Sequence, residues 1–135
     1  PEGRFSANFT RLGFHPGFGL THTLPLLVGQ QNATMMMYTG RRIKGEEAVQ
    51  MGLADVLVPL DQVRSAAMDL AKEIAISSPL GVVETRATMR AGLADRVRAA
   101  TDHELTIQNQ LRVTEDFQEG IKAASERRDP NFMGR

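Results

Sequence analysis

The sequence contains no cysteine and no tryptophan, and it has a single tyrosine among its 135 residues. The absence of cysteine excludes disulfide bonds, a thiolate nucleophile and cysteine-ligated metal sites. It also agrees with a reducing compartment, so we expect a cytoplasmic protein. The three histidines do not share the spacing of a metal-binding motif, and we expect no metal site.

An excess of one charge is lacking as well, since 16 basic residues balance 16 acidic ones. This balance gives no reason to expect nucleic acid or an anionic membrane surface as a partner. No apolar run approaches the roughly 20 residues that a membrane-spanning helix needs. With 41% hydrophobic residues, the chain is long enough for one domain with a hydrophobic core. We therefore expect a soluble protein without nucleic-acid or membrane partners.

Hydrophobic periodicity predicts a mainly helical chain with one or two short strands. Residues 4–9 alternate between polar and apolar side chains, as in a half-buried strand, and residues 53–59 read as a second strand. Either Thr21 or Thr23 can cap the first helix, and Gly29 suits its end. Helices are expected over residues 21–29, 31–40, 46–52, 61–77, 78–92, 95–113 and 114–128.

The C-terminal helices carry two patterns that predict how they face their surroundings. Over residues 61–77 apolar side chains recur at helical spacing, which predicts a face that docks on another surface. In the last helix, Asp116 and Glu119 are expected on a solvated face. Residues 128–135 are expected to form an irregular tail.

The stretch "LGFHPGFGLT", residues 12–21, packs three glycines and a proline into ten residues directly before an expected helix. Glycines admit backbone angles that other residues avoid, and a loop whose N–H groups precede a helix can hold developing negative charge or an ordered water. Connecting loops are also rich in glycine for purely structural reasons. The loop is therefore a candidate site that needs support from the rest of the chain.

Three stretches give the chain a resemblance to a known family. The first is "YTGRRIKGEEAVQMGLADVLVP" at residues 38–59, the second is "LGFHPGFGLTHTLPLLVG" at residues 12–29, and the third is "EDFQEGIKAASERRDPNF" at residues 115–132. Together they resemble the enoyl-CoA hydratase/isomerase (crotonase) superfamily. The resemblance covers essentially the whole chain, but it corresponds to only about the C-terminal half of a family member.

The resemblance implies an α/β crotonase-like fold, a spiral of strand-strand-helix turns. Residues 1–59 are expected to be the C-terminal end of that spiral core, with the pocket loop, helices and a last strand. Residues 60–135 are expected to form the helical region that builds trimers in the family, so a homotrimer or hexamer is expected. The preceding turns are expected in a missing N-terminal half of the same subunit.

The chemistry implied by the resemblance is that of acyl-CoA thioesters. Family members stabilise an enolate with two backbone N–H donors aimed at the thioester oxygen, which lowers the barrier by several kcal/mol. Both donors, and the first of two hydratase glutamates, are expected in the missing N-terminal half. No prosthetic group is implied, because coenzyme A enters as part of the thioester substrate.

The resemblance also assigns roles within the loop. In hydratases the second glutamate lies four residues before the first glycine of the loop; counting back from Gly13, that position is Phe9. The family's Pro-Gly peptide corresponds to Pro16 and Gly17, and the glycine N–H holds the attacking water. Because a phenyl ring cannot take or give a proton, Phe9 removes one group that hydration requires.

Other candidate site residues surround this peptide. His15 has the right residue type for proton transfer, although a loop histidine can equally be packed or solvent-facing. The remaining expected pocket residues are Phe14 and Phe18, whereas His22 is expected to form a hydrogen bond in the first helical turn. Arg127 matches a basic residue that lies beside the CoA phosphates in relatives, and an ordinary surface arginine is the alternative.

Three functions remain open on the sequence. The first is an enoyl-CoA hydratase/isomerase of the lyase class. The second is an isomerase, decarboxylase or thioester hydrolase that needs only enolate stabilisation, with His15 or a residue of the missing half as acid or base. The third is a non-catalytic module that binds CoA esters or serves assembly. Binding with turnover would support the first two, and binding without turnover would support the third.

Overall fold

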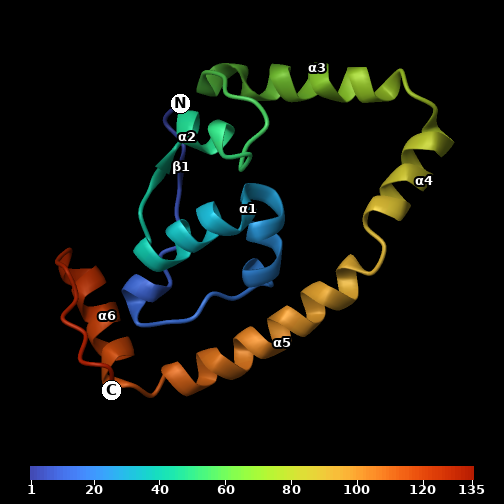
Figure 1. The fold of residues 1–135 in the computed structure, drawn as a ribbon. Coiled ribbons are helices and arrows are strands. Elements are labelled where there is room, and N and C mark those ends of the chain that lie inside the picture. Colours follow the sequence, from blue (N-terminus) through green and yellow to red (C-terminus); the bar gives the residue numbers. More distant parts are fainter.

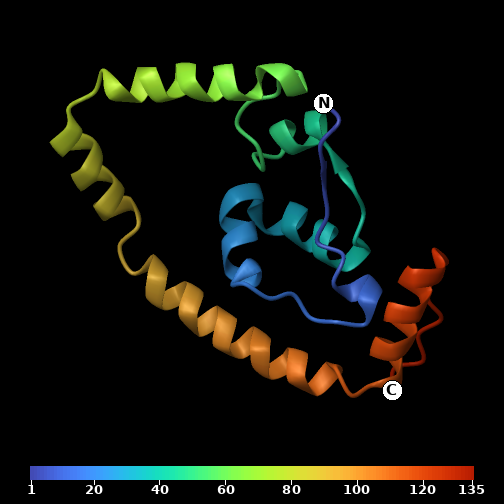
Figure 2. The ribbon, with the colours of Figure 1, turned by 180° about the vertical axis from the view of Figure 1, so that it is seen from behind.

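The computed structural model describes all 135 residues and shows helices arranged as an open arc (Figure 1). The outer helices α3, α4 and α5 run around an inner part that contains α1, α2 and β1, and α4 lies apart from the inner part in both views (Figure 2). None of the helices is both long and apolar enough to cross a membrane. The elements are β1 (Arg4–Phe5), η1 (Thr10–Leu12), α1 (Leu20–Thr39), β2 (Ile43–Lys44), α2 (Gly45–Gln50), η2 (Leu60–Gln62), α3 (Val63–Ala75), α4 (Pro79–Met89), α5 (Leu93–Leu111) and α6 (Glu115–Glu126).

The two strands pair with each other. β1 and β2 run antiparallel, with Phe5 opposite Ile43, and the Ile43 side chain is fully buried. The strand expected over residues 4–9 is therefore shorter than predicted, because the chain turns into the 3₁₀ helix η1 at residue 10. The strand expected over residues 53–59 is wrong, since this segment has no strand partner for its backbone groups in the chain.

Helix α1 joins the two helices expected around Gly29. Gly29 has φ 77° and ψ 160°, so the helix is kinked at the residue predicted to end its first half. The predicted threonine cap is wrong, because Gly19 in the left-handed region is the N-cap. At the other end, Gly40 adopts φ 58° and donates its N–H to the carbonyl of Met36, as a C-terminal glycine is expected to do.

The hydrophobic core is small and lies between α1, α2 and the two strands. Its buried residues are Ala7, Leu24, Val28, Ala33, Met36, Met37, Ile43 and Ala48. In contrast, α3 and α4 contain no buried residue. The apolar side chains predicted to dock, such as Val63, Leu70 and Ile74, are exposed in this chain.

Helices α5 and α6 return to the inner part and flank the glycine-rich loop. α5 packs along α1, and α6 packs on η1. In Figure 1 the loop between η1 and α1 runs beside α5. Helices α5 and α6 thus support the segment that carries the candidate site. The expected division of the chain at Pro59 stays a prediction.

Candidate functional site

The candidate site is the loop of residues 13–19, which joins η1 to α1. Pro16, Gly17 and Gly19 are buried, whereas Phe18 is 87% exposed. Phe18 and Gly19 both adopt positive φ values, 64° and 71°. The carbonyl of Gly17 accepts a 3.0 Å hydrogen bond from the N–H of Leu20, which begins the first turn of α1. The buried Pro16–Gly17 peptide therefore lies directly before the N-terminus of α1.

The N–H of Gly17 donates no hydrogen bond in this chain. Buried backbone N–H groups are almost always paired, and an unpaired one costs about as much as a lost hydrogen bond. Gly17 is buried, so its donor is one that a bound molecule could satisfy. This is the amide to which the family resemblance assigns the attacking water.

Gln108 of α5 holds the loop on one side of Gly17. Its Nε2 atom donates a 3.0 Å hydrogen bond to the carbonyl of His15. The contact is so close that a Cβ at Gly17 would lie 2.6 Å from the same Nε2 atom. Glycine is thus required at residue 17 for this hydrogen bond, because any larger residue would push the amide of Gln108 away.

Glu104 of α5 holds the loop on the other side. Its carboxylate is fully buried and accepts hydrogen bonds from the N–H of Gly19 at 2.6 Å, the N–H of Thr21 at 2.9 Å and the hydroxyl of Thr21 at 2.6 Å. Three donors compensate the loss of water around the charge, and the N-terminal end of α1 favours a negative group.

Sequence reasoning missed both Glu104 and Gln108. They lie in a polar helix in which neighbouring residues such as Asp102 and His103 are exposed. The only available signal was their spacing of four residues, which places them on one helix face. No feature of the local sequence says which face of α5 meets the loop.

His15 is half-buried and interacts mainly with its own loop. Its Nδ1 atom lies 2.8 Å from the carbonyl oxygen of Pro16, and its ring meets the ring of His103 edge-on with centroids 6.4 Å apart. No carboxylate hydrogen-bonds the imidazole. The Pro16 carbonyl belongs to the same peptide unit as the Gly17 N–H, so His15 contacts the candidate peptide. Its catalytic role stays a prediction.

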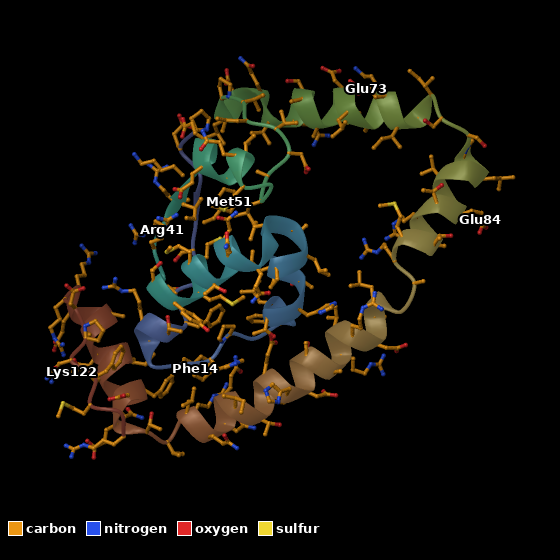
Figure 3. All side chains as sticks on the ribbon, in the orientation of Figure 1. Phe14, Arg41, Met51, Glu73, Glu84 and Lys122 are labelled. Carbon is orange, nitrogen blue, oxygen red and sulfur yellow. The ribbon has the colours of Figure 1, made fainter.

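The predicted pocket phenylalanines lie in three different environments. Phe9 is partly buried against the hydrophobic core, and its carbonyl accepts the N–H of Phe14 at 3.0 Å. Phe14 packs on Phe117 of α6 with ring centroids 5.2 Å apart, and the guanidinium of Arg112 lies 5.6 Å from its centroid. Figure 3 shows Phe14 in the loop near the junction of α5 and α6. Phe18 alone projects into solvent.

The first-turn histidine does not behave as expected. The Nε2 atom of His22 is buried and has no hydrogen-bond partner in this chain, so the expectation that the ring forms a hydrogen bond is wrong for this atom. The threonines beside it are satisfied, since Thr21 contacts Glu104 and the hydroxyl of Thr23 donates to the carbonyl of Gly19.

Arg127 ends α6 in the left-handed conformation, with φ 55°, and its side chain is exposed without an ion pair. The predicted contact with CoA phosphates stays a prediction.

Asp116 and Glu119 were expected on a solvated helix face, and this expectation is corrected because both bind the tail instead of water alone. The Asp116 carboxylate accepts the N–H groups of Met133 and Gly134 at 2.7 and 2.9 Å.

The contacts of Glu119 lower the pKa of its carboxyl group strongly. Its carboxylate forms a two-point ion pair with Arg128 at 2.6 and 2.9 Å and accepts the N–H of Asn131 at 2.8 Å. The hydrogen bond from Arg128, followed by that from Asn131, lowers the pKa of Glu119 to about 2. The same pairing raises the pKa of Arg128. This cluster fixes the tail to α6 and lies outside the loop.

Comparison with known proteins assigns the arrangement to a family. The family model for enoyl-CoA hydratase/isomerase matches residues 1–135. The chain is 33% identical over 132 residues to the 2,3-dehydroadipyl-CoA hydratase of Escherichia coli, covering 98% of this chain and 52% of that protein. It is 36% identical over 149 residues to the mitochondrial methylglutaconyl-CoA hydratase 1 of Pyricularia oryzae, covering 93% of this chain and 41% of that protein.

A solved structure shows the same fold. The crystal structure of an enoyl-CoA hydratase/isomerase from Pseudoalteromonas atlantica superposes with a TM-score of 0.84 at 29% identity, covering 97% of this chain and 53% of the other. The chain thus spans about half the length of the proteins that it matches. With a family match over its entire length, this chain belongs to the enoyl-CoA hydratase/isomerase family and has the crotonase fold over the part that it spans.

Proposed function

We propose that the full-length protein is an enzyme that binds acyl-CoA thioesters and promotes a reaction through an oxyanion-stabilised enolate. The observation that carries this proposal is the buried N–H of Gly17, which has no partner within the chain. The family match supports the thioester class, and the named relatives from Escherichia coli and Pyricularia oryzae are both hydratases of CoA esters. In the proposed site, the Gly17 amide faces the bound substrate or the water that attacks it.

Phe9 favours a reaction other than rapid hydration. Addition of water to a 2-enoyl thioester needs one group to take a proton from water and another to deliver a proton to carbon. Each such group contributes on the order of 10²–10⁴ in rate. The ring of Phe9 packs against the core and has no proton to exchange, so we propose poor hydratase activity.

The second candidate function is a reaction that does not add water to a carbon–carbon double bond. Isomerisation and decarboxylation through an enolate are two examples, and hydrolysis of the thioester by a water held elsewhere in the site is a third. The position of His15 favours it, because the imidazole touches the Pro16–Gly17 peptide without a carboxylate partner. A non-catalytic CoA-ester-binding or assembly module is the remaining alternative, and it predicts binding without turnover.

The test is steady-state hydration of crotonyl-CoA by the full-length protein and its Phe9→Glu variant, with Phe9→Gln as the matched control of similar size that cannot ionise. We expect tight binding of the unreactive ester butyryl-CoA, very slow hydration by the wild type, and faster hydration only in Phe9→Glu. Burial of the new acid raises its pKa and limits the gain. Wild-type hydration at ordinary enzymatic speed, unchanged in both variants, would show that another residue supplies the proton.

The assembly of the subunits and the contact with coenzyme A belong to the same proposal. The exposed apolar side chains of α3 and α4 support a closed homotrimer or a dimer of trimers in the full-length protein. Light scattering at several concentrations measures this oligomeric state.

We also propose that Arg127 contacts the phosphate end of coenzyme A. Its exposed guanidinium, which forms no ion pair in this chain, supports this contact. The cytoplasmic location expected from the sequence stays a prediction.

A further inference from the structure

Two polar side chains of α5 bracket the Gly17 amide. Gln108 binds the carbonyl of His15, two residues before Gly17, and Glu104 binds the N–H of Gly19, two residues after it. Glu104 and Gln108 lie four residues apart, so they occupy one face of α5 about one helical turn apart. The loop is therefore held on both sides of Gly17 by one rigid element.

The Glu104 contact determines which donors the loop retains. A charged side chain is rarely buried without compensation, and this carboxylate is fully buried against two backbone N–H groups and a hydroxyl. It thereby occupies the N–H groups of Gly19 and Thr21 at the start of α1. The buried N–H of Gly17 is left without a partner.

The residues between the two contacts have little conformational freedom. The ring of Pro16 restricts its φ angle, and Phe18 is held at φ 64°, a conformation that costs a residue with a side chain about 1–2 kcal/mol. Such strain persists only where the surroundings fix it. The contacts of Glu104 and Gln108 supply that restraint immediately before and after the strained segment.

We propose that Glu104 and Gln108 are positioning residues, which together hold the Pro16–Gly17 peptide so that the Gly17 N–H stays free to bind the substrate or its attacking water. This inference rests on the proposed function for its ligand, but the restraint itself is a property of the protein without ligand. A displacement of about 1 Å at a reacting group can cost on the order of 10²-fold in rate. Loss of the restraint should therefore reduce kcat more than it changes KM.

The experiment compares Glu104→Gln and Gln108→Ala in the full-length protein with Asp102→Asn, a matched control that neutralises an exposed acid on the same helix. In the ligand-free state, nuclear magnetic resonance should show a shifted Gly17 amide signal in both variants. Exchange of the Gly19 amide with solvent should be at least about tenfold faster in Glu104→Gln, because an amide side chain accepts more weakly than a carboxylate. Asp102→Asn should leave both readouts unchanged.

Kinetics complete the test on whichever acyl-CoA ester the wild type turns over, with crotonyl-CoA tried first. We expect kcat to fall on the order of 10–100-fold in each variant, with KM and butyryl-CoA affinity changed less than about threefold. If a variant shifts the Gly17 signal but the wild type neither binds nor converts a CoA ester, the proposed function fails while the restraint stands. An unshifted Gly17 signal in both variants, or kcat equal to wild type, overturns the positioning role.

The second variant keeps the test decisive if the first does not fold. Gln108→Ala removes an uncharged contact and leaves the buried carboxylate of Glu104 with all three donors. It should therefore fold even where a change at Glu104 prevents folding. A normal Gly17 signal and a normal kcat in folded Gln108→Ala would by themselves show that the contacts of α5 with the loop do not position the Gly17 amide.

Discussion

Gly120 of α6 lies against the backbone of Leu12, so close that a Cβ at residue 120 would be 2.3 Å from the carbonyl carbon of Leu12. The neighbouring loop residue Gly13 approaches α6 equally closely, since a Cβ there would lie 2.5 Å from the carbonyl oxygen of Asp116. The two glycines allow the backbones of η1 and α6 to touch. This contact fixes one end of the loop that carries the candidate site.

Gly120→Ala should destabilise the protein by about 1–3 kcal/mol, because the new methyl group meets main-chain atoms that cannot move aside cheaply. Gly81→Ala in α4 is the matched control. Its Cβ would meet only Ser78 at 3.5 Å, so the substitution should be neutral or stabilising by up to about 1 kcal/mol. Thermal unfolding of both variants measures the difference, and equal melting temperatures would contradict the close approach of α6 and η1.

Gly17→Ala should impair function with little loss of stability. The new methyl group would displace the flexible amide of Gln108 and break its hydrogen bond to the His15 carbonyl, which is worth about 1 kcal/mol. Turnover of acyl-CoA should fall by a factor similar to that in Gln108→Ala, and the double variant should be no worse than either single one. Additive losses in the double variant would show that the two residues act independently.

Phe18→Gly should stabilise the protein, because glycine adopts the observed φ of 64° without the penalty of a side chain. The expected gain is about 1 kcal/mol, measured by chemical or thermal unfolding. Tyr38→Gly is the control: Tyr38 is also an exposed aromatic residue, but it lies in the last turn of α1, where glycine costs up to about 1 kcal/mol. A loss of stability in Phe18→Gly as large as that in Tyr38→Gly would argue against the strained conformation.

The tail should detach from α6 in acid as Glu119 takes up a proton. The folded-state pKa of Glu119 is lowered from 4.5 to about 2, so its contribution to stability is complete above about pH 4.5 and is lost as the pH falls toward 2. The amide signal of Asn131 reports the transition, since its N–H donates to this carboxylate. Glu119→Gln should show a loosened tail already at neutral pH. Glu73→Gln, which changes an acid of α3 without an ion pair, should not (Figure 3).

The sequence alone predicted most helices, the family and the location of the loop. These features depend on local signals, such as the helical period after residue 60, the glycine that ends α1 and the density of glycine around Pro16. The strand expected over residues 53–59 was wrong because a strand depends on a partner as much as on its own residues. The helix with an apolar face that the sequence predicted over residues 61–77 is present as α3, but no part of this chain buries that face.

Only the tertiary structure decided how the loop is held. Glu104 looks like one more charge in a polar helix, yet it lies buried against Gly19, from which 85 positions separate it along the chain. Whether a carboxylate contacts water or the start of a helix depends on how two segments far apart in the sequence pack together. The periodicity of hydrophobic residues within one helix does not predict that packing. The glycine-rich composition of the loop can be read from the sequence, whereas the unpaired N–H of Gly17 and the positive φ of Phe18 are seen only in the folded chain, where Glu104 and Gln108 of α5 hold the loop.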